Sequence, residues 1–310
     1  MKNEIKIRIE GVPDLGAEPQ QHRRMKNRLN SKLEYYYGFG MGRYGDVLHE
    51  LFVHGGVNSC FTSSLPLAEF WQPDNLGRIS EKLRPFLGAR FDAERAPKFL
   101  EFPTDPEVEG KRIGRPSMTD LMILDCDWQI AVEAKFTEYS RMPSETVAEW
   151  LHRGDDAWFF TRRRVARVWL DYIRAAKCTR IRSDAAIFAE LGDVCYQFLH
   201  RTASACHKAN GADGHKPVLV YQLFFDANDP VSREDRIAFE HDLRRWARTL
   251  QLQNMKFLIM AVPIINAAEV KARHAGQHAE LFKEMEMNTI YKFDFDGIKI
   301  ENVDLTKEVE

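Results

Sequence analysis

Two short apolar runs in the middle of the chain predict a β-hairpin. Residues 121–124 and 130–132 are continuous hydrophobic stretches, and the polar residues 125–127 separate them. Continuous apolar runs of this length, bounded by a turn signal, are typical of strands that are buried on both faces. We therefore expect two paired strands within residues 117–137.

The remaining segments mix helical and strand patterns. Apolar residues at helical spacing, together with cap signals, predict helices over 46–53, 63–71, 79–87, 155–176, 185–209 and 233–250. Apolar runs predict strands over 98–102, 218–225 and 257–265, and a C-terminal hairpin that joins 290–295 to 298–300. We expect an α/β fold in which helices flank a mixed central β-sheet. We expect residues 1–60 to form an N-terminal arm and partly basic helices, and residues 61–310 to form the main domain, within one compact unit.

The bulk composition is that of a globular protein. The chain has 310 residues, of which 44% are hydrophobic and 29% charged. The formal net charge is only −2, so a polyanion would have to bind a local basic patch. No apolar run approaches the roughly 18 residues that a membrane helix needs, and the N-terminus lacks a signal-peptide pattern. The five cysteines are scattered, which argues against a disulfide framework or a zinc site and favours a cytoplasmic location.

Three charged residues on the hairpin are the main candidates for chemistry. Asp120 precedes the first apolar run, and Glu133 and Lys135 follow the second. Residues two apart in a strand share a face, and equal hairpin arms bring Asp120 near Glu133. Charge on buried strands is costly unless it is paired or holds a metal. Two carboxylates suit Mg²⁺, for which Mn²⁺ can substitute, and a nearby lysine can orient or activate the water that attacks a phosphodiester.

This arrangement resembles the PD-(D/E)XK nuclease superfamily, including bacterial restriction-endonuclease-like proteins. That superfamily has a helix–strand–strand–strand–helix–strand core, with an acid on the second strand and a (D/E)-x-K triplet on the third. Asp120 matches the first acid, Glu133 the second and Lys135 the lysine. The first acid usually follows a proline, whereas Thr119 stands there in this chain. The motif covers about residues 65–137, and the resemblance implies a restriction-endonuclease-like fold.

The resemblance also implies two further site residues. Many members carry a glutamate on the helix before the sheet, and Glu69 fits this position as a metal ligand, with Glu81 as a weaker match. Some subfamilies have a glutamine on a helix after the third strand, which Gln197 matches. For Glu69, the alternative that it is an ordinary solvated helix residue has equal weight. For Gln197, the same alternative is favoured over a role in the site. Glu101 and Asp105 lie near the first expected strand and are interpreted as structural.

Two basic segments are candidates for contacts with a nucleic-acid backbone. Residues 162–182 contain eight Lys and Arg residues and one acid, with Trp169 and Tyr172 interleaved. Residues 22–32 contain five Lys and Arg residues and no acid. Such faces suit phosphate contacts. The equally weighted alternative for 162–182 is a solvated helix whose aromatic residues belong to the core.

The sequence therefore predicts a Mg²⁺-dependent endonuclease that hydrolyses DNA, with restriction or defence as its setting. Asp120, Glu133 and Glu69 would bind the metal, and Lys135 and Gln197 would assist the reaction. DNA is the expected partner, dimerisation would suit double-strand cutting, and neither a membrane nor a small-molecule cofactor is expected. One alternative is a non-catalytic nucleic-acid-binding module on the same fold. Another is an interaction protein whose hairpin charges form an ordinary ion pair, which is worth little at a surface.

Overall fold

A mixed β-sheet forms the centre of the protein. The structure is a computed structural model that describes residues 35–37, 40–42, 62–139, 145–209, 214–276, 284 and 289–305. The strands of the sheet are β1 (Tyr35–Tyr37), β2 (Gly40–Gly42), β3 (Lys98–Thr104), β6 (Ser117–Leu124), β7 (Trp128–Lys135), β8 (Lys216–Asp226), β9 (Lys256–Ile264) and β10 (Lys299–Asn302). Within the described residues their order is β10-β9-β8-β7-β6-β3-β1-β2. A separate ribbon pairs β4 (Glu107–Val108) with β5 (Lys111–Arg112).

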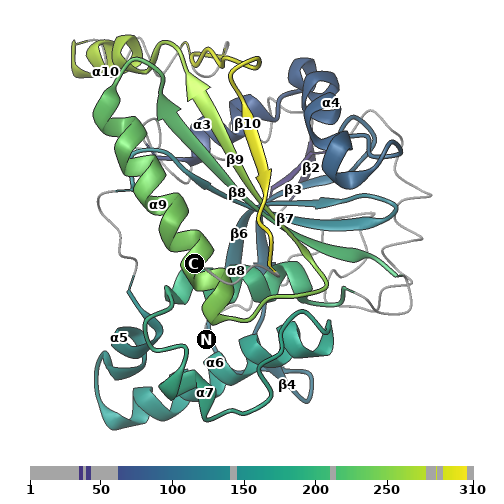
Figure 1. The fold of residues 1–310 in the computed structure, drawn as a ribbon, viewed down its shortest axis with the longest axis vertical. Coiled ribbons are helices and arrows are strands. Elements are labelled where there is room, and N and C mark those ends of the chain that lie inside the picture. Colours follow the sequence, from purple (N-terminus) through teal and green to yellow (C-terminus); the bar gives the residue numbers. More distant parts are fainter. Residues whose placement is uncertain are drawn as a thin grey trace.

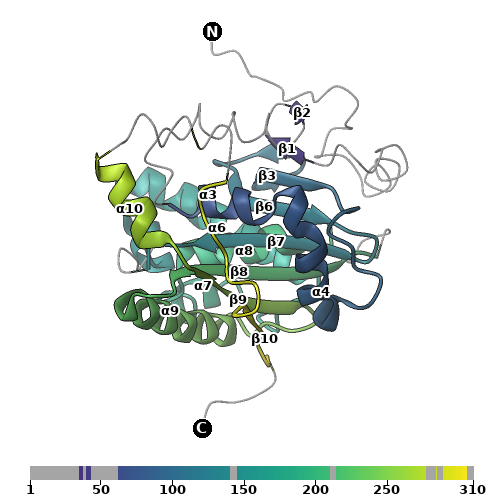
Figure 2. The same ribbon diagram turned by 90° about the horizontal axis from the view of Figure 1, so that it is seen from above.

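Helices cover both faces of this sheet (Figures 1 and 2). One face packs against α3 (Ser64–Phe70), α4 (Leu76–Leu87) and α10 (Ala267–Gly276), with the 3-10 turn η2 (Pro73–Asn75) between the first two. The other face packs against α5 (Val147–His152), α6 (Asp156–Ala175), α7 (Ala186–Ala189), α8 (Tyr196–Cys206) and α9 (Pro230–Thr249). The expected α/β class with a mixed sheet flanked by helices is confirmed.

The central hairpin has the predicted strands and turn. β6 and β7 pair antiparallel, with Leu121 opposite Val132, and the Asp125 N–H donates to the Trp128 carbonyl across the turn at 2.9 Å. All eight residues of β7 are buried. β3 continues the antiparallel order on one side of the hairpin, whereas β8 and β9 run parallel to β7 on the other. Parallel neighbours and two helical layers explain why these strands are apolar on both faces.

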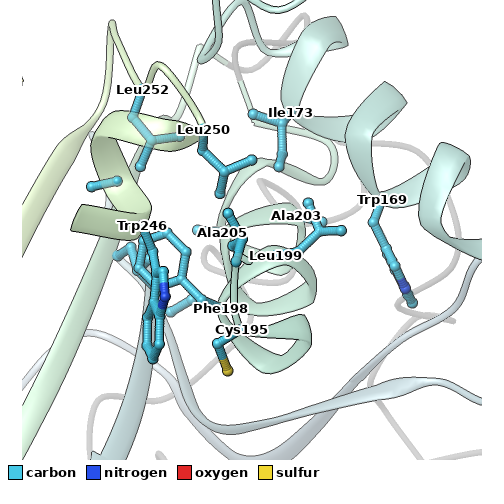
Figure 3. Close-up of a cluster of buried hydrophobic side chains, with 14 of the residues drawn as sticks. Trp169, Ile173, Cys195, Phe198, Leu199, Ala203, Ala205, Trp246, Leu250 and Leu252 are labelled. Carbon is cyan, nitrogen blue, oxygen red and sulfur yellow. The ribbon is translucent and has the colours of Figure 1, made fainter. Parts of the chain in front are cut away.

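Helix α8 is held in place by apolar contacts on two sides. Phe198 and Leu199 of α8 are fully buried, and they meet Trp169 and Ile173 of α6 and Trp246 of α9 in one core (Figure 3). Close packing of large side chains fixes the rotation of a helix about its own axis, because even a small rotation would open voids in the core. The orientation of α8 therefore determines which of its polar residues face the sheet.

Two element predictions were wrong because of tertiary contacts. The helix expected over 185–209 is interrupted between α7 and α8, where the carbonyl of Val194 accepts the N–H of Val147 and Cys195 forms a bridge with Thr146. The C-terminal hairpin does not form, because β10 pairs with β9, and Phe293 makes only an isolated bridge to Ile264.

The start of α3 is held by the segment that follows β7. Ser63 precedes this helix but makes no side-chain cap. Instead, its N–H and its Oγ both donate to Glu138 Oε1, at 3.1 and 3.3 Å. Ser63 therefore ties the start of α3 to the segment that follows β7.

The N-terminal region contributes one edge of the sheet. β1 pairs in parallel with β3 and antiparallel with β2. The basic segment 22–32 and the helix predicted over 46–53 lie outside the described residues. No helix in the described ranges has both the length and the apolar character needed to cross a bilayer.

Candidate active site

The hairpin brings two carboxylates and an ammonium group together. The register that places Leu121 opposite Val132 leaves Asp120 opposite Glu133, and Asp120 Oδ2 accepts the N–H of Ala134 at 2.8 Å. Glu133 and Lys135 lie on the same face of β7, where Lys135 Nζ donates to Glu133 Oε1 at 2.6 Å. The structure therefore places Asp120, Glu133 and Lys135 in one cluster, as strand parity and hairpin symmetry predict.

Arg201 of α8 completes this cluster, and sequence reasoning missed it. Its Nε donates to Glu133 Oε2, and its Nη2 lies 3.9 Å from Asp120 Oδ1. The side chain of Glu133 is only 1% exposed and those of Lys135 and Arg201 are 8% exposed, whereas that of Asp120 is 20% exposed. Both oxygens of Glu133 thus face cations in a buried setting, and Asp120 is the member of the pair that solvent can reach.

Ser117, which is itself held by His200 and Ser204, binds the Arg201 side chain. Its Nη1 donates to Ser117 Oγ at 2.8 Å, and Ser117 Oγ lies 2.7 Å from His200 Nδ1 and 3.2 Å from Ser204 Oγ. Burial and the charges of Arg201 and Lys135 hold the pKa of His200 well below its usual range, so the ring is neutral. A neutral ring can accept a hydrogen bond at Nδ1, which fits the serine hydroxyl that faces it.

Glu101 of β3 lies on the other side of Asp120. The register pairs Leu100 with Leu121 and Phe102 with Thr119, which leaves Glu101 opposite Asp120. Its φ of 51° lies in the left-handed region, which non-glycine residues adopt at a cost. Burial and the charge of Glu133 raise the pKa of Glu101 to about 7, although Arg201 opposes this effect. The sequence interpretation of Glu101 as merely structural overlooked its position beside Asp120.

The pKa values of the two hairpin carboxylates are shifted in opposite directions. Burial raises the pKa of Asp120 to about 8, and the charge of Glu133 adds to the effect, outweighing Arg201 and Lys135. Burial also raises the pKa of Glu133, but Arg201 and Lys135 together outweigh it and hold the pKa below its usual range. Burial lowers the pKa of Lys135, yet the Glu133 and Asp120 charges raise it overall. At neutral pH Glu133 is ionised, Lys135 is a cation and Asp120 holds a proton.

Comparison with known proteins places this cluster inside a family. Residues 44–275 match the family described as "Domain of unknown function (DUF6946)", and this span is well over half of the chain. The chain belongs to the DUF6946 family. The matched span contains every described member of the cluster, from Glu101 to Arg201. No match was found among curated proteins or among solved structures.

Glu69 of the DUF6946 domain lies on the opposite face of the sheet from the cluster. It belongs to α3, which packs in the second apolar core, and its two carboxylate oxygens accept the N–H groups of Ile290 and Tyr291 at 2.9 and 2.8 Å. Burial raises its pKa to about 8 in spite of these two hydrogen bonds. The structure therefore does not bring Glu69 to Asp120, and it gives Glu69 the role of fixing the C-terminal segment. Glu81 is exposed on α4.

The other sequence candidates are only partly drawn into the site. Gln197 lies one helical turn before Arg201 and is half-buried, but the hydrogen bonds described for the cluster are made by Arg201. In the basic segment, Trp169 is fully buried, and the Tyr172 hydroxyl donates to the Asp105 carbonyl at 2.8 Å. The aromatic residues within this segment are therefore core, as the alternative interpretation held, while most of its arginines remain exposed.

The carboxylate oxygens of the DUF6946 cluster are the type of ligand that Mg²⁺ prefers. Mg²⁺ is commonly held by one or two carboxylates and keeps water and phosphate oxygens as its other ligands. Asp120 and Glu133 supply such a pair from adjacent strands, and the Asp120 side chain is partly exposed. Among the described residues, however, there is no group of three or more His, Cys, Asp or Glu side chains that could hold an ion. The fit therefore rests on the pair alone.

Proposed function

We propose that the protein is a Mg²⁺-dependent nuclease that hydrolyses phosphodiester bonds in DNA on a restriction-endonuclease-like core. The observation that carries the proposal is the convergence of Asp120, Glu133 and Lys135 on two adjacent antiparallel strands. The element order also supports it. Helix α4 is followed by the sheet strands β3, β6 and β7, with the β4–β5 ribbon between β3 and β6, and then, after α5, α6 and α7, by α8 and β8. The acid and the Glu-x-Lys triplet fall on the second and third of these sheet strands.

Each residue then has a distinct task. Asp120 and Glu133 would hold the metal, which when bound neutralises phosphate charge and lowers the pKa of a water molecule. Lys135 is a cation, so it can orient the attacking water and stabilise charge on the phosphate, but it cannot accept a proton in this state. Arg201 keeps Glu133 ionised and correctly oriented. Lys135 and Arg201 would therefore act through electrostatics and positioning.

A cleavage assay with matched variants tests this proposal. Purified protein should cut DNA in Mg²⁺ or Mn²⁺ and not in EDTA, and RNA of the same sequence should be assayed in parallel. Asp120→Ala, Glu133→Ala and Lys135→Ala should each abolish cleavage while the chain stays folded. Asp127→Ala is the matched control, because Asp127 lies in the turn of the same hairpin and pairs with the exposed Arg90. Undiminished cleavage by Lys135→Ala would refute the assigned mechanism.

One observation favours a second candidate, a non-catalytic nucleic-acid-binding module on the same fold. Both oxygens of Glu133 are already paired with cations, so no charge on that residue is left uncompensated. This candidate predicts DNA binding that weakens with salt and survives Asp120→Ala, with no metal-dependent cleavage. Thermal unfolding with and without Mn²⁺ separates the two, since only the nuclease predicts a stabilisation that Asp120→Ala removes.

A further inference from the structure

Arg201 contacts both carboxylates of the candidate metal site. Its Nε donates to Glu133 Oε2, and its Nη2 lies 3.9 Å from Asp120 Oδ1. The other oxygen of Glu133 accepts the ammonium group of Lys135, and the other oxygen of Asp120 accepts the N–H of Ala134. Among the described residues, Arg201 is the one cation that has an ion pair with each of the two carboxylates. The oxygens of the pair are therefore already engaged without a metal.

Charge balance makes this arrangement difficult to combine with a bound Mg²⁺. An ion shared by Asp120 and Glu133 needs at least one oxygen of each, and the Arg201 guanidinium lies against one oxygen of each. The charge of the ion would balance the two carboxylates, so the charges of Lys135 and Arg201 would both be left uncompensated. The Arg201 side chain is only 8% exposed, and an uncompensated charge is costly at such burial. This cost falls if the guanidinium leaves the carboxylates.

The remaining contacts of Arg201 allow its side chain to move. Its Nη1 donates to Ser117 Oγ at 2.8 Å and lies 3.2 Å from His200 Nδ1, and neither partner carries a charge that would hold the guanidinium in place. Helix α8 itself is fixed by its buried apolar residues, but a long arginine side chain can take another rotamer on a fixed helix. The ion pairs with Asp120 and Glu133 are therefore the main electrostatic restraint on the guanidinium.

We propose that Arg201 is the resident cation of this site, and that its contacts with Asp120 and Glu133 exclude a bound divalent cation. This inference rests on the proposed function and describes how its metal site is regulated. In the metal-free protein, Arg201 keeps Glu133 ionised and oriented in place of the ion. The guanidinium must be released before both carboxylates can take a metal. The pairing of both Glu133 oxygens then belongs to a closed state of the site rather than to an inert ion pair.

The Arg201 Nε–H reports this closed state directly. Because it is buried and donates to Glu133, it should give a ¹H–¹⁵N signal that exchanges slowly with water in the metal-free protein. The signal is assigned by its loss in Arg201→Lys. Saturating Mg²⁺, which is diamagnetic, should raise its exchange rate to that of the exposed arginines, because the hydrogen bond to Glu133 is then broken.

The Mn²⁺ affinity of variants tests the competition. Free Mn²⁺ is measured by electron paramagnetic resonance at about pH 8.5, so that proton competition at Asp120 is small. Arg201→Met should bind Mn²⁺ about tenfold more tightly than the wild type, because no guanidinium has to be displaced. Ser117→Ala, which keeps every charge but loosens Arg201, should bind it about threefold more tightly. Arg174→Met is the matched control, because Arg174 is a largely buried arginine that pairs with two aspartates outside the cluster, and it should leave the affinity unchanged.

The outcomes separate this inference from the nuclease proposal. A slowly exchanging Arg201 Nε–H that persists in saturating Mg²⁺, or weaker Mn²⁺ binding in Ser117→Ala and Arg201→Met, would overturn the inference, while metal-dependent cleavage by the wild type would still support the nuclease. If Arg201→Met does not fold, the wild-type Nε–H and the affinity of Ser117→Ala still decide the question. Absence of Mn²⁺ binding in the wild type and both variants, together with no cleavage, would overturn both proposals.

Discussion

Replacing Asp120 by asparagine should make the protein more stable and inactive at the same time. Asparagine keeps an oxygen that can accept the Ala134 N–H, but it carries no charge at any pH. The wild-type carboxyl has a pKa of about 8 in the folded state against 3.8 as its ordinary value. An acid whose pKa is raised in the folded state stabilises the fold fully only below its ordinary pKa of 3.8, and that stability is lost as the pH rises towards 8.

The size of the effect follows from proton linkage. Each pH unit between 3.8 and 8 lowers the free energy of unfolding of the wild type by up to about 1.4 kcal/mol, because the unfolded chain releases the proton and the folded chain keeps it. Between pH 4 and pH 7 the accumulated difference is about 4 kcal/mol. Asp120→Asn avoids this loss, so its advantage over the wild type should be near zero at pH 4 and largest near pH 8.

Urea unfolding at a series of pH values measures this difference directly. Asp127→Asn is the matched control, because the Asp127 side chain is partly exposed and pairs with the exposed Arg90, and it should change stability by less than about 0.5 kcal/mol. A variant Asp120→Asn that is less stable than the wild type at pH 8, or whose difference does not change with pH, would refute the reasoning. Mn²⁺ should raise the melting temperature of the wild type increasingly from pH 6 to pH 9, because the metal must displace the Asp120 proton, and it should leave Asp120→Asn unchanged.

Three further substitutions test the surroundings of the site. Arg201→Met should lower the free energy of unfolding by about 3–5 kcal/mol in urea, since it leaves Glu133 buried with less compensation, and adding Glu133→Gln should recover part of the loss. Glu101→Gly should raise the free energy of unfolding by about 1 kcal/mol, because glycine adopts a φ of 51° without strain. Glu109→Gly, at the same φ, should raise it by a similar amount, but only Glu101→Gly should alter cleavage. At pH 4, where its raised pKa carries little linkage cost, Glu69→Gln should lower the free energy of unfolding by about 1–3 kcal/mol, because an amide NH₂ would face one of two backbone donors. This loss should shrink as the pH rises towards 8, and cleavage per folded molecule should stay unchanged; lost cleavage would return Glu69 to the site.

The sequence predicts those parts of the fold and the site that depend on local periodicity. Strand parity places Glu133 and Lys135 on one face, and hairpin symmetry places Asp120 opposite Glu133, because both depend on residues within one short segment. Arg201 could not be placed in this way. Its position depends on how α8 packs between α6 and α9, and helical spacing alone gives no face for a helix that is buried on several sides. A basic residue one turn after Gln197 was the only available signal.

The failed predictions have the same origin in distant contacts. Residues 290–295 have a strand-like pattern, but the carboxylate of Glu69 takes the N–H groups of Ile290 and Tyr291, and β9 pairs with β10 instead. Glu101 faces Asp120 only through the pairing of β3 with β6, which a linear pattern does not specify. Each of these contacts joins segments far apart in the chain, so local propensity could not reveal them.

The charge balance of the cluster is the strongest physical reason to attribute chemistry to it. An ion pair that serves only stability can be replaced by apolar residues with little loss, and a purely structural network satisfies its charges. Here three carboxylates, Asp120, Glu133 and Glu101, lie near only two cations, Lys135 and Arg201. The pKa values of Asp120 and Glu101 are raised as a result of this balance and of burial. Glu101 also holds a strained φ beside Asp120. These costs to stability are concentrated on the solvent-accessible side of the cluster, where a substrate phosphate and a cation would enter. A gain in stability with loss of cleavage in Asp120→Asn would therefore mark the cluster as functional, whereas a loss of stability would mark it as structural.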